Sequence, residues 1–249
     1  MLRPVTLLVL CLVAAVARAE TRPPSFTVVL DPGHGGSNLG AAGAVPGVYE
    51  KKLTLALSRM VRRALERDGV HVVVTRDSDT YLTLGERVRR ANAASADAFV
   101  SLHANATPEH QRRGFYAYIL SREVSDVEAR KASERAPDPA EATVARARVR
   151  ELAEQSARLA EALRTELGKV READHGTRQA PFDVLEGLRM PAALLEVGFI
   201  DHEEEGVELL SPEVLRQLAD AIAAGIEAFV RAAPRRPADG PDEAARHQP

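Results

Sequence analysis

Short apolar runs rich in β-branched residues alternate along this chain with longer segments whose apolar residues recur at helical spacing. The runs that predict strands are residues 26–30, 70–75, 98–103, 114–120, 182–185 and 192–197. The segments that predict helices are residues 52–67, 84–94, 142–167 and 212–230. Strands that alternate with helices favour an α/β fold, in which helices cover both faces of a largely parallel sheet.

The first residues of the chain differ in character from the rest. Arg3 precedes an apolar run over residues 5–16, and a small-x-small triplet follows at residues 17–19. This pattern is typical of a secretory signal peptide, so we expect residues 1–19 to be removed and the protein to be exported, periplasmic or secreted. The apolar run is shorter than the ~20 residues that span a bilayer, which argues against an uncleaved anchor. We therefore expect no stable membrane anchor after cleavage.

Two other segments interrupt the pattern of strands and helices. Residues 121–139 are charged and break at Pro137-Asp138-Pro139, and we interpret them as an insertion. Residues 233–249 carry prolines and charges with too few apolar side chains to offset the entropy of ordering, so we expect a disordered tail. After a short lead at residues 20–25, one domain is expected over residues 26–232, without an internal repeat.

Charge and cysteine content exclude several classes of protein. The formal net charge is -3 and the pI is about 6.2, which gives no reason to expect a nucleic-acid partner. The single cysteine, Cys11, lies inside the N-terminal apolar run. Intrachain disulfides and cysteine-rich metal sites are therefore excluded, and the stability of the exported protein must come from its core.

Residues of the metal-ligand type fall where strands are expected to end. His34 lies just after the first strand, His103 ends the strand at 98–103, and Glu196 is near the end of the strand at 192–197. Functional groups of open α/β sheets gather at the carboxyl ends of strands, so these side chains are expected at one edge. Glu50 heads the helix after the glycine-rich loop and joins them. Two histidines and a carboxylate, with a fourth position left to water, form the ligand set of a catalytic zinc site.

Glu196 is suited to a second role, that of a base. It lies between Leu195 and Val197, where an unpaired charge would be costly without a functional reason. In zinc hydrolases the ion lowers the pKa of its water towards ~7, and a free carboxylate takes the proton of that water and later delivers it to the leaving amine.

Each of these features also has a structural interpretation. A lone histidine after a strand is often only hydrogen-bonded, Glu50 could be a helix-start acid favoured by the macrodipole, and the loop at 31–36 could be a tight turn or a phosphate cradle. The phosphate reading is weaker because no lysine follows at P-loop spacing. Four other histidines are expected to be solvated, whereas His175 remains a candidate for lining the site. The four are His71, His110, His202 and His247.

Several motifs occur together and in order. They are VVLDPGHGG, Tyr49-Glu50-Lys51, TRDSDTYLTLGERVRRAN, SLHANA and RQAPFDVLEGLRMPAALLEVGFIDH. In this combination the chain resembles the zinc-dependent N-acetylmuramoyl-L-alanine amidases of the bacterial cell wall, over nearly all of residues 26–230. The resemblance implies a single α/β domain with a twisted, mainly parallel sheet, phosphorylase/hydrolase-like, and one Zn²⁺ per chain in a groove.

The resemblance also implies roles for individual residues. The metal ligands fall on His34, Glu50 and His103, and the catalytic glutamate on Glu196. The implied reaction is hydrolysis of the amide between N-acetylmuramic acid and L-alanine in peptidoglycan, for cell-wall remodelling or daughter-cell separation. Asn105 and Gln179 match polar positions beside the site, as orienting or substrate contacts. Arg87 and Asn92 also match, but on a helix, where packing or capping is expected.

The insertion at 121–139 is similar to, though shorter than, an inserted helix that blocks the groove in members that split daughter cells. We hypothesise that an acid of this segment, Glu123, Glu128 or Glu134, occupies the open zinc position until an activator, of the LytM-domain type, displaces the helix. The alternative is a surface helix rich in salt bridges. No additional wall-binding module is recognised, so targeting would come from the catalytic domain or a partner, and the protein is expected to be a monomer.

Two other functions stay open on the sequence. A wall-binding pseudo-enzyme would keep the fold without turnover, although all four positions of the site are intact. A zinc peptidase acting on the stem peptide would use the same ligands on a different amide.

Overall fold

The computed structural model describes residues 26–232. Its strands are β1 (Thr27–Pro32), β2 (His71–Val74), β3 (Ala98–Asn105), β4 (Phe115–Leu120), β5 (Asp174–Ala180) and β6 (Ala192–Phe199). Its helices are α1 (Glu50–Arg67), α2 (Leu84–Ala93), α3 (Arg122–Glu134), α4 (Pro139–Leu167), α5 (Glu203–Glu208) and α6 (Pro212–Ala232). The predicted signal peptide at 1–19, the lead at 20–25 and the tail at 233–249, with Cys11 and His247, lie outside the described residues.

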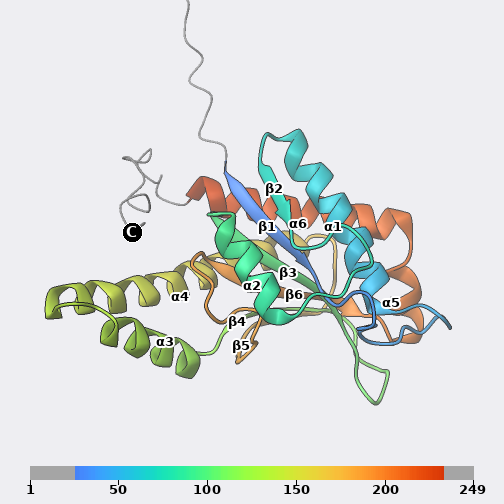
Figure 1. The fold of residues 1–249 in the computed structure, drawn as a ribbon. Helices are drawn as coiled ribbons and strands as arrows, with labels where there is room; N and C mark the ends of the chain where they lie inside the picture. The colour runs from blue at the N-terminus through green and yellow to red at the C-terminus, as the bar shows by residue number, and fades with distance from the viewer. Residues whose placement is uncertain (1–25, 233–249) are drawn as a thin grey trace, which may run out of the picture.

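The strands form one six-stranded sheet in the order β2-β1-β3-β6-β4-β5 (Figure 1). β2, β1, β3 and β6 are mutually parallel, β4 runs antiparallel to β6, and β5 runs parallel to β4. Parallel strands buried on both faces explain why β1 and β3 are continuous apolar runs rather than alternating ones. The predicted α/β class with a mainly parallel sheet is confirmed.

Helices cover the sheet unequally. α1, α4 and α6 pack on one face, where Leu57, Leu163 and Ile222 are fully buried against strand residues such as Leu195. The other face carries α2, through Ala91, and the irregular segment at 182–190. The carboxyl ends of β1 and β3 lie between these layers, which leaves the loops after them free to form a site.

One expected strand is absent, and two observed elements were not expected. Residues 182–185 form a turn rather than a strand, since they follow Pro181 and bury Val184 and Leu185 without joining the sheet. The strand of this region is β5, which lacks apolar alternation because most of its side chains are at least partly exposed at the sheet edge. The short helix α5 is also unexpected. It begins at His202, whose Nδ1 accepts hydrogen bonds from the backbone N–H groups of Glu204 and Glu205, both at 3.2 Å, so His202 caps a helix rather than being simply solvated.

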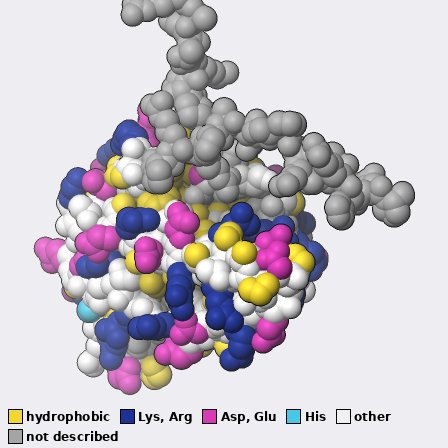
Figure 2. All heavy atoms as spheres, turned by 90° about the vertical axis from the view of Figure 1, so that its left-hand side faces the viewer, with side chains coloured by type: hydrophobic (Ala, Val, Ile, Leu, Met, Phe, Trp, Pro, Cys, Tyr) yellow, Lys and Arg dark blue, Asp and Glu magenta, His cyan; other side chains and the backbone are white. Residues whose placement is uncertain are grey.

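The inserted segment is helical. α3 and α4 pack against each other as a hairpin that projects beyond the sheet (Figure 1). Figure 2 views the molecule from the side on which the hairpin projects and shows Lys and Arg side chains interspersed with Asp and Glu. Ser121 caps α3 and Asp138 caps α4, and Pro139 stands at the first position of α4, so the turn between the helices is fixed by local chemistry.

Within residues 26–232, no helix is both long enough and apolar enough to cross a membrane.

Candidate active site

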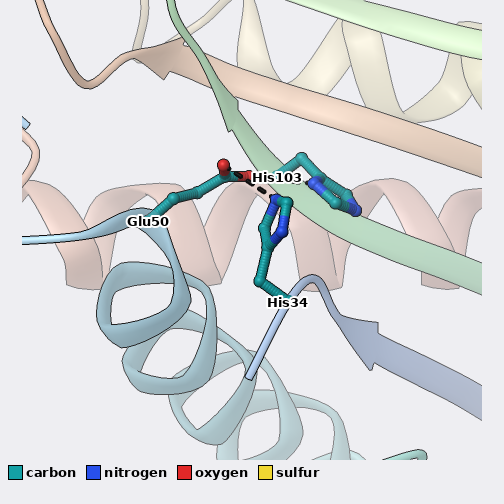
Figure 3. Close-up of side chains that lie close together, drawn as sticks. All are labelled: His34, Glu50 and His103. Atoms are coloured by element: carbon teal, nitrogen blue, oxygen red, sulfur yellow. Dashed lines mark hydrogen bonds and ion pairs between the residues drawn. The ribbon is translucent and has the colours of Figure 1, made fainter. Parts of the chain in front are cut away.

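Three side chains from distant parts of the chain meet at the carboxyl edge of the sheet (Figure 3). His34 follows β1, Glu50 is the first residue of α1, and His103 lies near the end of β3. His34 Nε2 is 2.9 Å from Glu50 Oε2, and His103 Nδ1 is 2.9 Å from Glu50 Oε1. One ligand atom from each residue lies within 4.8 Å of the others, which is the arrangement of a possible metal site.

Glu50 is buried at the start of α1 and is charged there. The backbone N–H of Ala41 donates to Oε2 at 3.0 Å and that of Ala104 to Oε1 at 3.1 Å. Burial alone would raise the pKa of Glu50, but the hydrogen bonds from His103 and His34 outweigh it and hold this pKa well below its usual range. Burial opposes the charged form of His103 as well, yet the bond to Glu50 and the nearby charge of Glu196 raise the pKa of His103.

The loop after β1 holds the ligands in close contact. His34 adopts a left-handed backbone conformation, with φ 62°, and its Nδ1 is 2.9 Å from Asn38 Oδ1, which orients the ring. A Cβ added at Gly33 would lie 2.3 Å from His103 Cε1, and one at Gly40 would lie 2.6 Å from Glu50 Oε2. Glycines thus leave room for the three side chains to converge, and the donor set fits a metal of the zinc type.

Gly40→Ala is expected to weaken zinc binding at least tenfold, because its Cβ would also lie 2.7 Å from His34 Cδ2 and would displace two candidate ligands. Gly47→Ala is the matched control. Gly47 has a similar positive φ, 78° against 70°, but nothing lies within 4 Å of its added Cβ. Competition of each purified variant with a zinc-sensitive dye measures the affinity. Equal losses in both variants would show that backbone strain, and not crowding of the ligands, controls the site.

The buried carboxylate of Asp31 stabilises the start of this loop through hydrogen bonds. Asp31 has no exposed surface, and its Oδ1 accepts hydrogen bonds from Arg87 Nη1 at 2.7 Å and Thr75 Oγ1 at 2.5 Å. Its Oδ2 accepts from Ser101 Oγ at 2.8 Å. Asp31 therefore ties β1 to β3, to α2 and to the end of β2.

Two buried arginines bind the carbonyl groups of the same loop. Arg76 donates to Pro32 O at 2.9 Å and to Gly33 O at 2.6 Å. Arg87 donates to Pro32 O at 2.8 Å and to His34 O at 2.5 Å. Arg87 thus has the structural role that was expected, and it fulfils this role by binding the carbonyl groups of the loop. The sequence does not predict these contacts of Arg76 and Asp31, because the bonds from Arg76 to the loop and those to the Asp31 carboxylate join residues more than 40 positions apart.

Glu196 lies beside the possible metal site without being part of it. It is paired in register with His103 of β3 on one side and with Tyr116 of β4 on the other. Its Oε2 atom is buried and has no hydrogen-bond partner in the described structure. Burial raises the pKa of Glu196 to about 7. An unpaired acid of this kind is a candidate for proton transfer.

The raised pKa of Glu196 determines how the metal-free protein responds to pH. Between its ordinary value of 4.5 and about 7, the folded chain keeps a proton that the unfolded chain releases. The contribution of Glu196 to the free energy of unfolding therefore falls as the pH rises through this window. Urea unfolding measures this on chelator-treated wild type and Glu196→Gln. Relative to the wild type, the free energy of unfolding of Glu196→Gln should increase between about pH 4.5 and about pH 7. Parallel stability curves would contradict the prediction.

A cleft of about 630 Å³ opens over these residues. His34, Glu50, His103 and Glu196 line it together with Asn105, which lies at the end of β3. Its other walls are largely apolar and include Tyr81, Leu82, Leu84, Phe182 and Val184. The size of the cleft and its few convergent polar groups are typical of a site for an organic substrate.

Comparison with known proteins places this site in a family. Residues 28–228 match the family model of N-acetylmuramoyl-L-alanine amidase. The chain belongs to this amidase family. The match covers most of the described residues, including the possible metal site and Glu196. The predicted family and enzyme class are confirmed, and so is hydrolysis of the amide between N-acetylmuramic acid and L-alanine as the reaction of the family.

Individual relatives agree with the family match. The chain is 32% identical to N-acetylmuramoyl-L-alanine amidase AmiC of Neisseria meningitidis, over 82% of this chain and 52% of that protein. It is 33% identical to amidase AmiA of Escherichia coli, over 81% of this chain and 75% of that one. The structure of amidase AmiC2 of Nostoc punctiforme superposes with a TM-score of 0.65 at 32% identity, covering 83% of this chain and 97% of the other. The chain thus spans about half the length of the Neisseria relative.

Two residues predicted beside the amidase site lie on β5, away from the lining of the cleft. Gln179 Oε1 accepts a hydrogen bond from the backbone N–H of Arg122 at 3.1 Å, at the start of α3. His175 Nε2 is 2.7 Å from the carbonyl oxygen of Arg113, and its ring stacks on Tyr116 with centroids 4.5 Å apart. Their roles as substrate contacts stay predictions, whereas Asn105 is placed inside the cleft.

The three acids proposed for autoinhibition of the amidase also lie outside the lining of the cleft. Glu128 Oε1 accepts a hydrogen bond from the backbone N–H of Gly187 at 2.5 Å. Glu134 is 3.9 Å from Arg130, and Glu123 is exposed in the first turn of α3. In this conformation none of the three occupies a position beside His34, Glu50 and His103. Autoinhibition and a LytM-domain activator stay predictions that require α3 to move.

Proposed function

We propose that this chain is the catalytic domain, over residues 26–232, of an exported zinc-dependent amidase. It would cleave peptidoglycan between N-acetylmuramic acid and the L-alanine of the stem peptide. His34, Glu50 and His103 would hold the zinc. The observation that carries the proposal is the buried, unpaired Oε2 of Glu196 in register beside His103, because it puts a proton acceptor next to the metal ligands without making it one of them.

Zinc, when bound, supplies a Lewis acid that polarises the scissile carbonyl and acidifies a water. The chain's own residues supply the proton transfers. Glu196 takes a proton from the attacking water and returns it to the nitrogen of the leaving L-alanine, so the free amine departs with the proton that it needs. Its raised pKa suits both steps, since the carboxyl group then gives up a proton as readily as it accepts one near neutral pH.

Other residues hold this geometry. Arg87 and Arg76 keep the loop of His34 in place through its carbonyl groups, and Asn38 orients the ring of His34. The apolar walls of the cleft limit the access of water around the scissile amide. Export is supported by the signal-like segment at 1–19, and a peptidoglycan substrate requires it.

Mass spectrometry of purified peptidoglycan digested by the zinc-loaded protein tests this function. We expect glycan strands that carry free N-acetylmuramic acid, together with intact peptides that begin with L-alanine. Shortened peptides still attached to the glycan would identify a zinc peptidase instead. Binding of peptidoglycan without any cleavage by the zinc-loaded protein would identify a wall-binding pseudo-enzyme.

A further inference from the structure

Side chains of β4 and β5 lie on the same face of the sheet as Glu196, the proposed general base. Register pairs Glu196 of β6 with Tyr116 of β4, and register partners project their side chains from the same face of a sheet. Two residues further along β4, Tyr118 projects from the same face and is paired in register with Arg178 of β5. The face that carries Glu196 thus extends over β4 and β5, beyond the cleft.

Arg178 is held over this face by an aromatic ring. Its guanidinium carbon lies 5.1 Å from the ring centroid of Tyr116, and the ring of His175 stacks on Tyr116 at 4.5 Å. Tyr116 itself is only 4% exposed, so its ring is fixed by its neighbours. The contact restrains the long side chain of Arg178 without using any of its hydrogen-bond donors.

The charge of Arg178 is left without an acidic partner. Arg178 is exposed, and over residues 26–232 it makes neither a side-chain hydrogen bond nor an ion pair. Two arginines close to β5 differ: Arg164 is 2.7 Å from Asp174, and Arg113 is 2.8 Å from Glu204. All the donors of the Arg178 guanidinium therefore remain free for a ligand, in a fork that matches a carboxylate.

The spacing of the sheet places this cation at a defined distance from the reaction. β6, β4 and β5 are consecutive strands, and neighbouring strands lie about 4.8 Å apart. Arg178 pairs with Tyr118, two residues along β4 from the partner of Glu196, so its Cα is roughly 12 Å from that of Glu196. An extended peptide advances about 3.5 Å per residue. A long arginine side chain directed towards Tyr116 shortens the gap further, so a group on the residue after L-alanine comes within its reach.

We propose that Arg178 is a specificity residue that binds the carboxylate of the amino acid that follows L-alanine in the stem peptide. This inference rests on the proposed function. The scissile amide lies at the metal ligands and Glu196, the leaving peptide runs across β4 over Tyr116, and its first acidic group pairs with the free guanidinium on β5. Stem peptides in which that acid is converted to its primary amide would then be poorer substrates.

Two synthetic muramyl peptides that differ only in an acid or a primary amide at the second residue test the proposal. The zinc-loaded wild type should cleave the acid with about tenfold higher kcat/KM, mainly through a lower KM. Arg178→Gln should cleave both at the rate of the wild type on the amide, and Arg178→Lys should keep part of the preference. Arg148→Gln is the matched control, because Arg148 is an exposed arginine near the start of α4 that does not line the cleft.

Binding provides a readout that does not depend on turnover. In a zinc-loaded Glu196→Gln background, calorimetry with the two released peptides should show the same preference for the acid, lost on adding Arg178→Gln. Cleavage of both substrates at one rate, or a preference that survives Arg178→Gln, would overturn the role of Arg178 and leave the amidase intact. Cleavage of neither substrate by the wild type would count against the proposed function, and the binding comparison would still decide the role of Arg178.

Discussion

Glutamine in place of Glu196 is expected to lower the rate of peptidoglycan hydrolysis by about 10²–10⁴-fold, the usual contribution of a positioned general base. Glutamine has nearly the same shape but can neither take a proton from water nor deliver one to the leaving amine. The three candidate metal ligands are untouched, because Glu196 lies beside them and not among them. Zinc content should therefore stay at one ion per chain while kcat falls.

Elemental analysis and release of dye-labelled peptidoglycan measure the two quantities on the same preparation. Glu154→Gln, which removes an exposed carboxylate from α4, is the matched control and should behave as the wild type. A Glu196→Gln protein that loses its zinc would show that Glu196 is a ligand. One that keeps full activity would place the base elsewhere in the cleft.

Replacement of Arg87 by methionine is expected to lower the free energy of unfolding by about 3–5 kcal/mol, because it leaves the fully buried carboxylate of Asp31 without its cation. This is a large fraction of the 5–15 kcal/mol that stabilises a typical domain. The change also removes the hydrogen bond to His34 O, so zinc should bind more weakly. Urea unfolding in the presence and absence of a chelator separates the two effects.

A second substitution distinguishes a lost charge partner from lost packing. Asp31→Asn removes the buried charge and keeps a similar shape, so the double variant Asp31→Asn/Arg87→Met should be more stable than Arg87→Met alone. Additive losses in the two single variants would mean that the ion pair is energetically unimportant. The loop would then depend chiefly on Arg76, which contacts the carbonyl groups of Pro32 and Gly33.

The site can be located from the sequence because several of its residues lie at the ends of predicted strands. His34 and His103 follow or end apolar runs that are long enough to be recognised, and parallel neighbours necessarily end at one edge. Glu196 falls opposite His103 because β6 inserts beside β3, and no local pattern in the sequence specifies that neighbour. Family resemblance, and not spacing, points to Glu50, because a carboxylate at the start of a helix has an ordinary structural explanation.

Other features depend on contacts that the sequence does not display. β5 lacks the apolar alternation of a strand, since at the edge of the sheet most of its side chains are at least partly exposed. The run at 182–185 has the composition of a strand but packs as a turn against the layer of α2. The hydrogen bonds from Arg76 and Arg87 to the loop of His34 span 43 to 55 residues, a distance at which charge in the sequence gives no indication of its partner.

β6 is the last strand within residues 26–232, yet it occupies an inner position of the sheet. It separates β2, β1 and β3 on one side from β4 and β5 on the other. Without Ala192–Phe199, no strand would lie between β3 and β4, and Glu196 would be missing beside His103. The same eight residues join the two parts of the sheet and carry Glu196, so a chain shortened before Ala192 is expected to lack both an intact sheet and the acid beside His103.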